Sequence, residues 1–150
     1  MNDKRKFYIN GTWVNPTIKS DFQVINPSNE QPYAIISLGS KEDVDLAVNV
    51  AKKAFIKWSQ VDKKQRISLL ENLLKIYKSR WDEITQTMSE EMGAPLDWSS
   101  SAQTSSGADH INDFIMRLKN FEFEKKFNKN SNNYIVYEPI GVCGLITPWN

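Results

Sequence analysis

The residues best suited to chemistry lie in the last four positions of the sequence, Thr147-Pro148-Trp149-Asn150. They follow residues 140–146, a continuous apolar run typical of a strand that is buried on both faces, as in a parallel sheet. In open α/β sheets, ligands bind beyond the carboxyl ends of the strands. The ring of Trp149 and the amide of Asn150 are therefore candidates for a ligand site, and a turn asparagine without chemistry is the alternative.

Two further side chains could react, but their surroundings favour structural roles. Cys143 is the only cysteine and lies inside the apolar run, where burial should suppress the thiolate and leave the thiol inert. His110 is the only histidine and lies between apolar positions of a helical pattern, which favours a structural histidine. One cysteine and one histidine form neither a disulfide framework nor a multi-cysteine zinc site, so we predict no metal site.

Extended segments dominate the first forty residues. Residues 7–9 and 12–14 flank Asn10-Gly11, which is the strongest short signal for a β-hairpin. A second extended piece, residues 22–25, ends at the turn sequence of residues 26–29, and residues 33–38 form a third apolar run that stops at Gly39.

The apolar spacing then changes to that of helices. Ser40, with Asp43 three residues on, predicts the start of an amphipathic helix that runs to Trp58. Asp62 predicts the start of a second helix, which we expect to continue to Met92 as about thirty residues, roughly 45 Å long. Gly93 predicts its end through a left-handed position. Polar residues 99–107 then precede a third helical pattern over residues 108–121.

The remainder returns to extended structure. Residues 121–127 fit either a helix end or a strand, residues 128–133 predict a turn, and residues 134–137 predict a strand that ends before Pro139. A final strand buried on both faces needs helices on both sides, so we expect the chain to belong to a larger body.

Composition excludes several classes of function. Nineteen basic and eighteen acidic residues leave a net charge of +1 on 150 residues, which gives no electrostatic basis for binding nucleic acid or an anionic membrane. The apolar runs are shorter than the roughly 18 residues that span a bilayer, and the charged N-terminus leads into no signal sequence. We expect a cytoplasmic protein.

In order and spacing, the motifs of this chain resemble those of NAD(P)-dependent aldehyde dehydrogenases. The segment that ends in Pro148-Trp149-Asn150 resembles a family segment that ends in the same three residues. Earlier motifs agree over essentially the whole chain, although Ala94 replaces the lysine that is common in the family. These motifs are the hairpin of residues 8–14, the turn Asn26-Pro27-Ser28, the helices of residues 41–58 and 66–74, and Glu91-Met92-Gly93 followed by Pro95.

The resemblance implies an oxidoreductase that oxidises an aldehyde to a carboxylic acid with NAD or NADP. In the family, a cysteine thiolate attacks the aldehyde to form a thiohemiacetal, and a glutamate activates water. Asn150 matches the family's asparagine that stabilises the oxyanion, and Ile146, Thr147, Pro148 and Trp149 match the segment that lines the cofactor. Neither the family's nucleophilic cysteine nor its general base has a match in this chain, because in the family both lie further along than the asparagine. Cys143 does not match the nucleophile, since it lies seven residues before Asn150. We therefore expect the 150 residues to be inactive alone.

The resemblance also implies an α/β fold, the N-terminal part of the aldehyde dehydrogenase fold. By this comparison, residues 7–25 and 121–138 are parts of a β-rich oligomerisation arm. Residues 26–120 and 139–150 form an incomplete Rossmann-like NAD(P)-binding domain, and the catalytic domain is absent. The expected partners are a small aldehyde and further copies in a homo-oligomer. The alternatives are a non-catalytic truncated product that pairs with full-length subunits through its strand edges, and an independent helical binding domain.

Overall fold

The computed structural model describes residues 1–147, and strands and helices alternate in blocks along them. The strands are β1 (Asn2–Lys4), β2 (Phe7–Ile9), β3 (Thr12–Val14), β4 (Asp21–Asn26), β5 (Gln31–Ser37), β6 (Glu124–Lys126) and β7 (Tyr134–Val136). The helices are α1 (Lys41–Trp58), α2 (Lys63–Ser79), α3 (Trp81–Met92), the single turn α4 (Leu96–Trp98), the π-helix η1 (Ser99–Thr104) and α5 (Ser105–Asn120).

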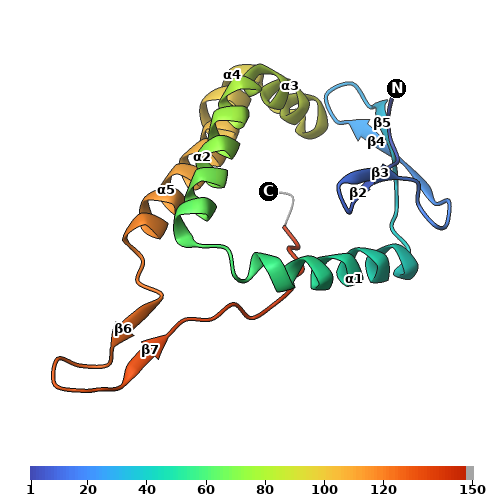
Figure 1. Ribbon diagram of the computed structural model, residues 1–150. Coiled ribbons are helices and arrows are strands. Elements are labelled where there is room, and N and C mark those ends of the chain that lie inside the picture. Colours follow the sequence, from blue (N-terminus) through green and yellow to red (C-terminus); the bar gives the residue numbers. More distant parts are fainter. Residues whose placement is uncertain (148–150) are drawn as a thin grey trace.

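These elements surround a central opening (Figure 1). The N-terminal strands form one side, α1 crosses below, and the antiparallel pair of α2 and α5 forms the opposite side. Helix α3 returns across the top and contacts β4. The β6–β7 hairpin projects outward from the corner below α5, and the last described residues run back toward the opening.

The main sheet has the order β1-β5-β4. Strands β4 and β5 are antiparallel around the predicted turn of residues 26–29, where the carbonyl of Asn26 accepts from the amide of Glu30 at 2.8 Å. Strand β1 pairs in parallel with β5, from Asn2 beside Ala34 to Lys4 beside Ile36. The sequence pattern misses β1 because its residues are all polar and exposed, so its pairing depends on β5 alone.

The predicted N-terminal hairpin is confirmed. Strands β2 and β3 are antiparallel, with Phe7 opposite Val14, and Asn10 and Gly11 both have positive φ, 55° and 76°. Two consecutive left-handed residues match the twist of the strands, which explains the Asn-Gly signal. Tyr8 and Trp13 lie opposite each other with ring centroids 5.2 Å apart.

Helix α1 begins at the predicted cap. Ser40 and Asp43 form a reciprocal capping box, in which the Asp43 carboxylate accepts from the backbone N–H of Ser40 at 2.9 Å. The same carboxylate accepts from the backbone N–H and the hydroxyl of Thr17, at 2.8 and 2.7 Å. Asp43 thereby joins the loop after the hairpin to the start of α1.

The prediction of one thirty-residue helix is wrong, because the helix is interrupted at Arg80. This residue has φ −107° and ψ 21°, and α2 ends there while α3 begins in a new direction. Contacts with η1 hold α3 in place: the indole N–H of Trp81 donates to Ser100 at 2.9 Å, and the hydroxyls of Thr85 and Thr104 are 2.9 Å apart. No proline or glycine marks this break, so the local sequence favours continuation.

The left-handed end of α3 is confirmed, since Gly93 has φ 72°. The next helical segment starts at Leu96, earlier than the predicted residue 108, and passes through η1. Ser99 and Thr104 are fully buried, and Tyr77 donates to the Thr104 carbonyl at 3.0 Å. Small hydroxyl residues permit the close packing of η1 against α3, although their polarity resembles that of a loop.

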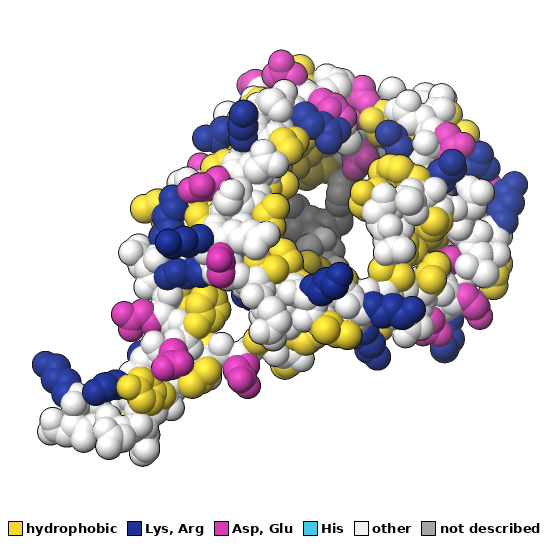
Figure 2. Space-filling view, in the orientation of Figure 1, with side chains coloured by type: hydrophobic (Ala, Val, Ile, Leu, Met, Phe, Trp, Pro, Cys, Tyr) yellow, Lys and Arg dark blue, Asp and Glu magenta, His cyan; other side chains and the backbone are white. Residues whose placement is uncertain are grey.

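Few apolar side chains are buried among residues 1–147: only Ala34, Ala108 and Ile115. Figure 2 shows hydrophobic side chains along the rim of the central opening. The amphipathic faces predicted from spacing exist, but large members such as Val44 and Leu73 remain exposed.

Candidate functional site

The segment that leads to the candidate site does not form the predicted buried strand. Residues 137–147 have no regular secondary structure, and Ile140, Leu145 and Ile146 are 95%, 89% and 97% exposed. A strand requires a hydrogen-bonded neighbour, and none pairs with this segment within the described residues. The apolar run therefore indicates side chains suited to burial. Whether it forms a strand depends on a neighbouring strand that can pair with it.

Within the candidate site, Thr147 is the residue that reaches a cavity, and Ile146 precedes it with an exposed side chain. Pro148, Trp149 and Asn150 lie outside the described residues. The predicted cofactor and oxyanion roles therefore stay predictions.

The expected burial of Cys143 is also wrong. Its side chain is exposed, and its Sγ donates to the carbonyl of Gly141 at 3.8 Å. His110 lies on α5 and is exposed as well. No group of three or more His, Cys, Asp and Glu side chains among the described residues could hold a metal ion.

A cavity of about 780 Å³ lies between α3 and the main sheet. This volume falls within the range of about 300–1,000 Å³ typical of small-molecule sites. The sheet contributes Val24, Tyr33, Ala34 and Ile36, whereas Thr147 comes from the C-terminal segment; the α3 side contributes Arg80, Glu83, Ile84, Thr87, Met88, Glu91 and Met92. Asn2 and Lys4 of β1 and Gln103 of η1 complete the lining. The cavity wall thus combines apolar side chains with polar and charged ones.

Two titratable groups in this cavity are affected by burial. Burial raises the pKa of Glu91, and burial together with the neighbouring Glu90 carboxylate raises the pKa of Tyr33. Arg80 instead donates to Glu83, with Nε–Oε2 2.8 Å, and this hydrogen bond lowers the pKa of Glu83. Of the two carboxyl groups that line this cavity, Glu91 is the one whose pKa burial raises. Its sequence signal is its position in the motif Glu91-Met92-Gly93, which indicates a helix end and not a ligand site.

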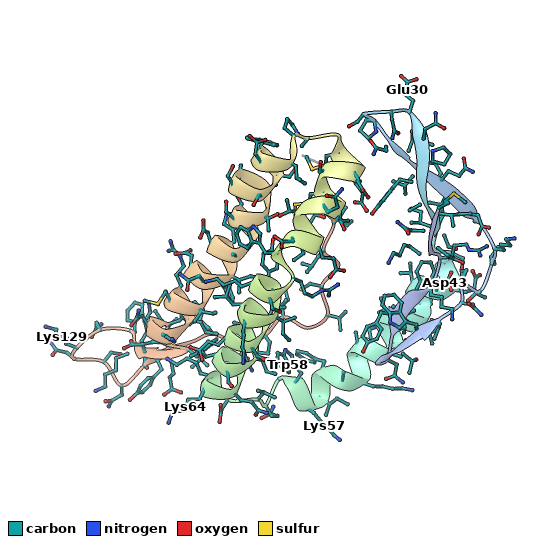
Figure 3. All side chains as sticks on the ribbon, turned by 90° about the horizontal axis from the view of Figure 1, so that it is seen from above. Glu30, Asp43, Lys57, Trp58, Lys64 and Lys129 are labelled. Carbon is teal, nitrogen blue, oxygen red and sulfur yellow. The ribbon has the colours of Figure 1, made fainter. Side chains whose placement is uncertain are left out.

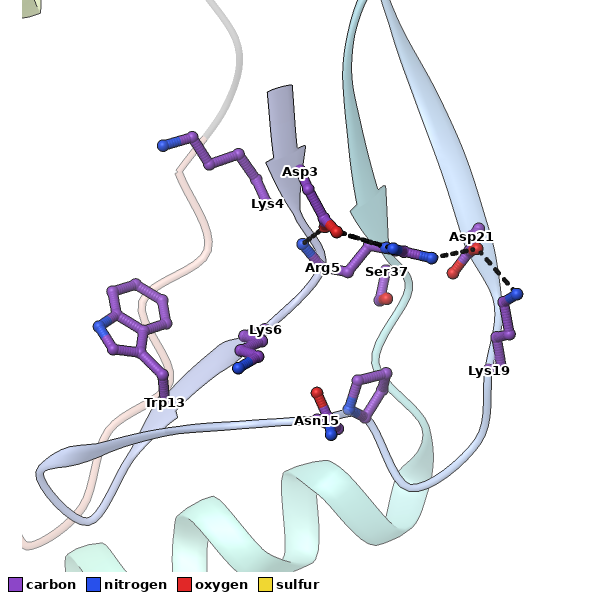
Figure 4. A pocket seen from close by; sticks show the side chains of 10 residues that line it. Asp3, Lys4, Arg5, Lys6, Trp13, Asn15, Lys19, Asp21 and Ser37 are labelled. Atoms are coloured by element: carbon purple, nitrogen blue, oxygen red, sulfur yellow. Dashed lines mark hydrogen bonds and ion pairs between the residues drawn. The ribbon is translucent and has the colours of Figure 1, made fainter. Parts of the chain in front are cut away.

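A second cavity, of about 650 Å³, lies beside the N-terminal strands (Figure 4). Arg5 donates to Asp3 at 2.7 Å and to Asp21 at 3.2 Å, and Lys19 lies 3.5 Å from Asp21. The hydrogen bonds from Arg5 hold the pKa of Asp3 at about 2. Because Arg5 already binds two carboxylates, this network joins β4 to the segment after β1, and we interpret it as structural.

None of the helices within residues 1–147 combines the length and the apolar character needed to cross a membrane. The described part thus offers a cavity in which burial raises the pKa of one carboxyl group, that of Glu91, next to an exposed apolar segment.

Comparisons with known proteins agree over nearly the whole chain. The family model described as "Aldehyde dehydrogenase family" matches residues 13–150. The chain is 44% identical over 151 residues to a 3-succinoylsemialdehyde-pyridine dehydrogenase from Pseudomonas sp., and 39% identical over 150 residues to a putative aldehyde dehydrogenase from Staphylococcus aureus. Both alignments cover 100% of this chain and 31% of the relative. The chain thus spans about a third of the length of these relatives.

Solved structures agree with the fold. An aldehyde dehydrogenase from Bartonella henselae superposes with a TM-score of 0.86 at 44% identity, covering 88% of this chain and 28% of that chain. Aldehyde dehydrogenase C from Pseudomonas syringae, solved with NAD+ and octanal, superposes with a TM-score of 0.80 at 31% identity, covering 83% and 26%. The mixed order of helices and strands is the N-terminal part of this fold, as predicted. By the family model and these similarities, the chain belongs to the aldehyde dehydrogenase family.

Proposed function

We propose that this chain supplies the cofactor-lining segment and the oxyanion donor of an enzyme that oxidises an aldehyde to a carboxylic acid with NAD or NADP. The observation that carries the proposal is the family match, which extends through residue 150 and so includes all five candidate residues. A relative at 31% identity was solved with NAD+ and octanal, which supports a nicotinamide cofactor and an aldehyde substrate.

The proposed role of Asn150 is to donate a hydrogen bond from its side-chain amide to the aldehyde oxygen. Nucleophilic attack places negative charge on this oxygen, and a pre-aimed donor stabilises it by about 3–4 kcal/mol. An amide is suited to the task because it stays neutral at every working pH. The donor would therefore act equally well across the pH range in which the rest of the site titrates.

The described part of the cofactor segment fits a nicotinamide dinucleotide. Ile146 offers a 97% exposed apolar side chain, and Thr147 lies at the 780 Å³ cavity. An apolar side chain beside a cavity suits the flat faces of the nucleotide bases. Ile146, Thr147, Pro148 and Trp149 would hold the cofactor, which when bound accepts hydride from the substrate carbon.

The substrate class to test first follows from the 44% identical relative, whose name indicates a semialdehyde. We further propose a cytoplasmic protein that acts in a homo-oligomer, with residues 7–25 and 121–138 as parts of the arm between subunits. In this chain these two segments lie on different sides of the opening (Figure 1). Contacts between residues 7–25 and residues 121–138 would therefore have to form between copies of the chain or through additional residues.

The experiment is a chimera in which residues 1–150 replace the matching segment of the 44% identical dehydrogenase from Pseudomonas sp.. We expect NADH or NADPH formation from a panel of aldehydes, including semialdehydes. Asn150→Ala in the chimera should lower kcat about 100- to 1,000-fold, because one oxyanion donor is lost. The matched control is Asn49→Ala at an exposed position of α1, outside the proposed arm, which should leave kcat unchanged. An unchanged kcat for Asn150→Ala would refute the oxyanion role.

The second candidate is a non-catalytic module that pairs with full-length subunits, favoured by the exposed apolar residues of the C-terminal segment and of β7. Two measurements on the isolated 150-residue chain test these candidates: its activity and its association with full-length subunits. Sustained reduction of NAD or NADP by the isolated chain would contradict our expectation that it is inactive alone. Co-sedimentation of the labelled, inactive chain with the chimera would support the pairing role.

A further inference from the structure

The first turn of α2 carries two cations on one face, and each of them contacts the end of a different helix. Lys63 and Arg66 are three residues apart, so their side chains lie side by side on the helix surface. Asp62 caps the helix by accepting from the backbone N–H of Gln65 at 2.7 Å, which fixes where this turn begins. The corner where α1 meets α2 lies around Trp58 and Lys64 in Figure 3.

Lys63 closes the end of α5. Its Nζ donates to the carbonyls of Lys119 and Phe121, each at 3.1 Å. The last carbonyls of a helix have no partner within the helix, and a cation there also interacts favourably with the helix dipole. Lys119 in turn pairs with Glu71 on α2 at 2.8 Å, so the end of α5 is held to α2 at two points.

Arg66 closes the end of α1. Its Nη2 donates to the carbonyl of Ser59 at 3.2 Å and, more weakly, to that of Trp58 at 3.5 Å. Its guanidinium also lies 5.9 Å from the ring centroid of Trp58 and 6.0 Å from that of Phe123, within the range of cation–π attraction. The Nε atom of Arg66 is buried and has no partner among the described groups. Carbonyls and rings therefore hold the guanidinium.

Phe123 belongs to the base of the β6–β7 hairpin. The rings of Phe121, Phe123 and Tyr137 form a cluster, with Phe121 4.9 Å from Phe123 and 5.2 Å from Tyr137. The N–H of Tyr137 donates to the carbonyl of Phe123 at 2.8 Å, which closes the base of the hairpin. Beyond this base, three residue pairs join β6 to β7. A two-stranded hairpin is marginally stable in water without further packing.

We infer that Lys63 and Arg66 are positioning residues that fix the direction in which the β6–β7 hairpin leaves the helices. Lys63 holds the chain where α5 ends, and Arg66 holds the aromatic base against Trp58, so the two cations together set the position and the angle of the hairpin. This orienting role of Lys63 and Arg66 is independent of what the hairpin binds. It is also independent of the proposed role of Asn150, so either role can fail without the other.

The test measures the position of the hairpin in the 150-residue chain, with the labelled chain diluted in an excess of unlabelled chain so that self-association adds no distances between labels. Spin labels are attached at Lys129→Cys on the hairpin tip and Lys52→Cys on α1, in a Cys143→Ser background. We expect one narrow distance distribution in the parent chain, a broader one for Lys63→Met or Arg66→Met, and the broadest for the double variant. Lys64→Met is the matched control, since Lys64 lies on the same turn and is exposed. It should leave the distribution unchanged.

Hydrogen exchange separates positioning from general stability. In Arg66→Met, the amide of Tyr137 should exchange at least about tenfold faster, while amides in the middle of α2 and α5 keep their rates. Phe123→Leu removes the ring but not the charge and should broaden the distances as well, which keeps the test valid if Arg66→Met fails to fold. Unchanged distances in Lys63→Met, Arg66→Met and Phe123→Leu, or equal acceleration of all amides, would overturn the inference.

Discussion

At the scale of single residues, Asp43 combines more roles than its sequence signal indicates. The capping pattern predicts its bond to Ser40, and this bond is present. Its second role, accepting two hydrogen bonds from Thr17 across 26 residues of sequence, depends on the tertiary structure. The backbone hydrogen bonds from Ser40 and then Thr17 lower the pKa of Asp43 from 3.8 to about 2.

This pKa sets a pH dependence of stability. A carboxyl group whose pKa is lower in the folded state contributes stability above its unfolded pKa and loses it as the pH falls through the folded value. We expect Asp43→Asn to lower the thermal midpoint at pH 7, because an amide NH2 would face N–H and O–H donors. The difference from the parent chain should shrink between about pH 4 and about pH 2. Circular dichroism melts at a series of pH values measure it.

Asp45→Asn is the control for this prediction, because Asp45 lies on the same helix and is exposed. Its effect on the midpoint should be small at every pH. A constant difference between Asp43→Asn and the parent chain down to pH 2 would contradict the assigned pKa.

At the scale of elements, helix ends decide how the fold closes. The signals at Ser40, Asp62 and Gly93 are local, and all three mark ends that the structure confirms. The break at Arg80 carries no such signal, because the contacts of α3 with η1 impose it from outside. Gly93 also has a long-range role, since α3 ends against the turn between β4 and β5.

Gly93→Ala should destabilise the chain for two reasons. Its φ of 72° costs an L-residue about 1–2 kcal/mol. A Cβ atom would also lie 2.8 Å from Cγ of Pro27, and overpacking of this kind costs about 1–3 kcal/mol. Urea unfolding measures the loss of free energy.

Pro27→Ala in the Gly93→Ala background should recover only the overpacking contribution. Gly144→Ala is the matched control, since its Cβ would meet no atom within 4 Å. Equal stability of Gly93→Ala and Gly144→Ala would show that the left-handed position is dispensable.

At the scale of the whole molecule, the chain leaves much apolar surface uncovered. Hydrophobic side chains line the opening in Figure 2, and Ile140, Leu145 and Ile146 stand almost fully exposed. Contiguous exposed apolar surface of this kind marks sites of interaction or of aggregation.

The isolated 150-residue chain should therefore bind a hydrophobic dye such as ANS and self-associate. Replacing Ile140, Leu145 and Ile146 together with asparagine should lower both signals, because these side chains are the most exposed large apolar ones within residues 1–147. Dye fluorescence and sedimentation velocity provide the measurements. Replacing Asn49, Asn72 and Asn112 with serine, at exposed positions of the helices, is a control that should change neither. A monomeric chain with a sharp, reversible thermal transition would argue against the prediction.

Features of this protein that depend on neighbouring residues were predictable from the sequence. Asn10-Gly11 specifies its hairpin because two left-handed positions are needed there, and the caps and the motif order sufficed to identify the family. The break at Arg80, the helical start at Leu96 and the lack of regular secondary structure over residues 140–146 became clear from the tertiary structure alone. The physical reason is that a buried hydroxyl or a strand is stabilised by groups distant in sequence. Ile140, Leu145 and Ile146 lie exposed because no strand pairs with their segment among the described residues.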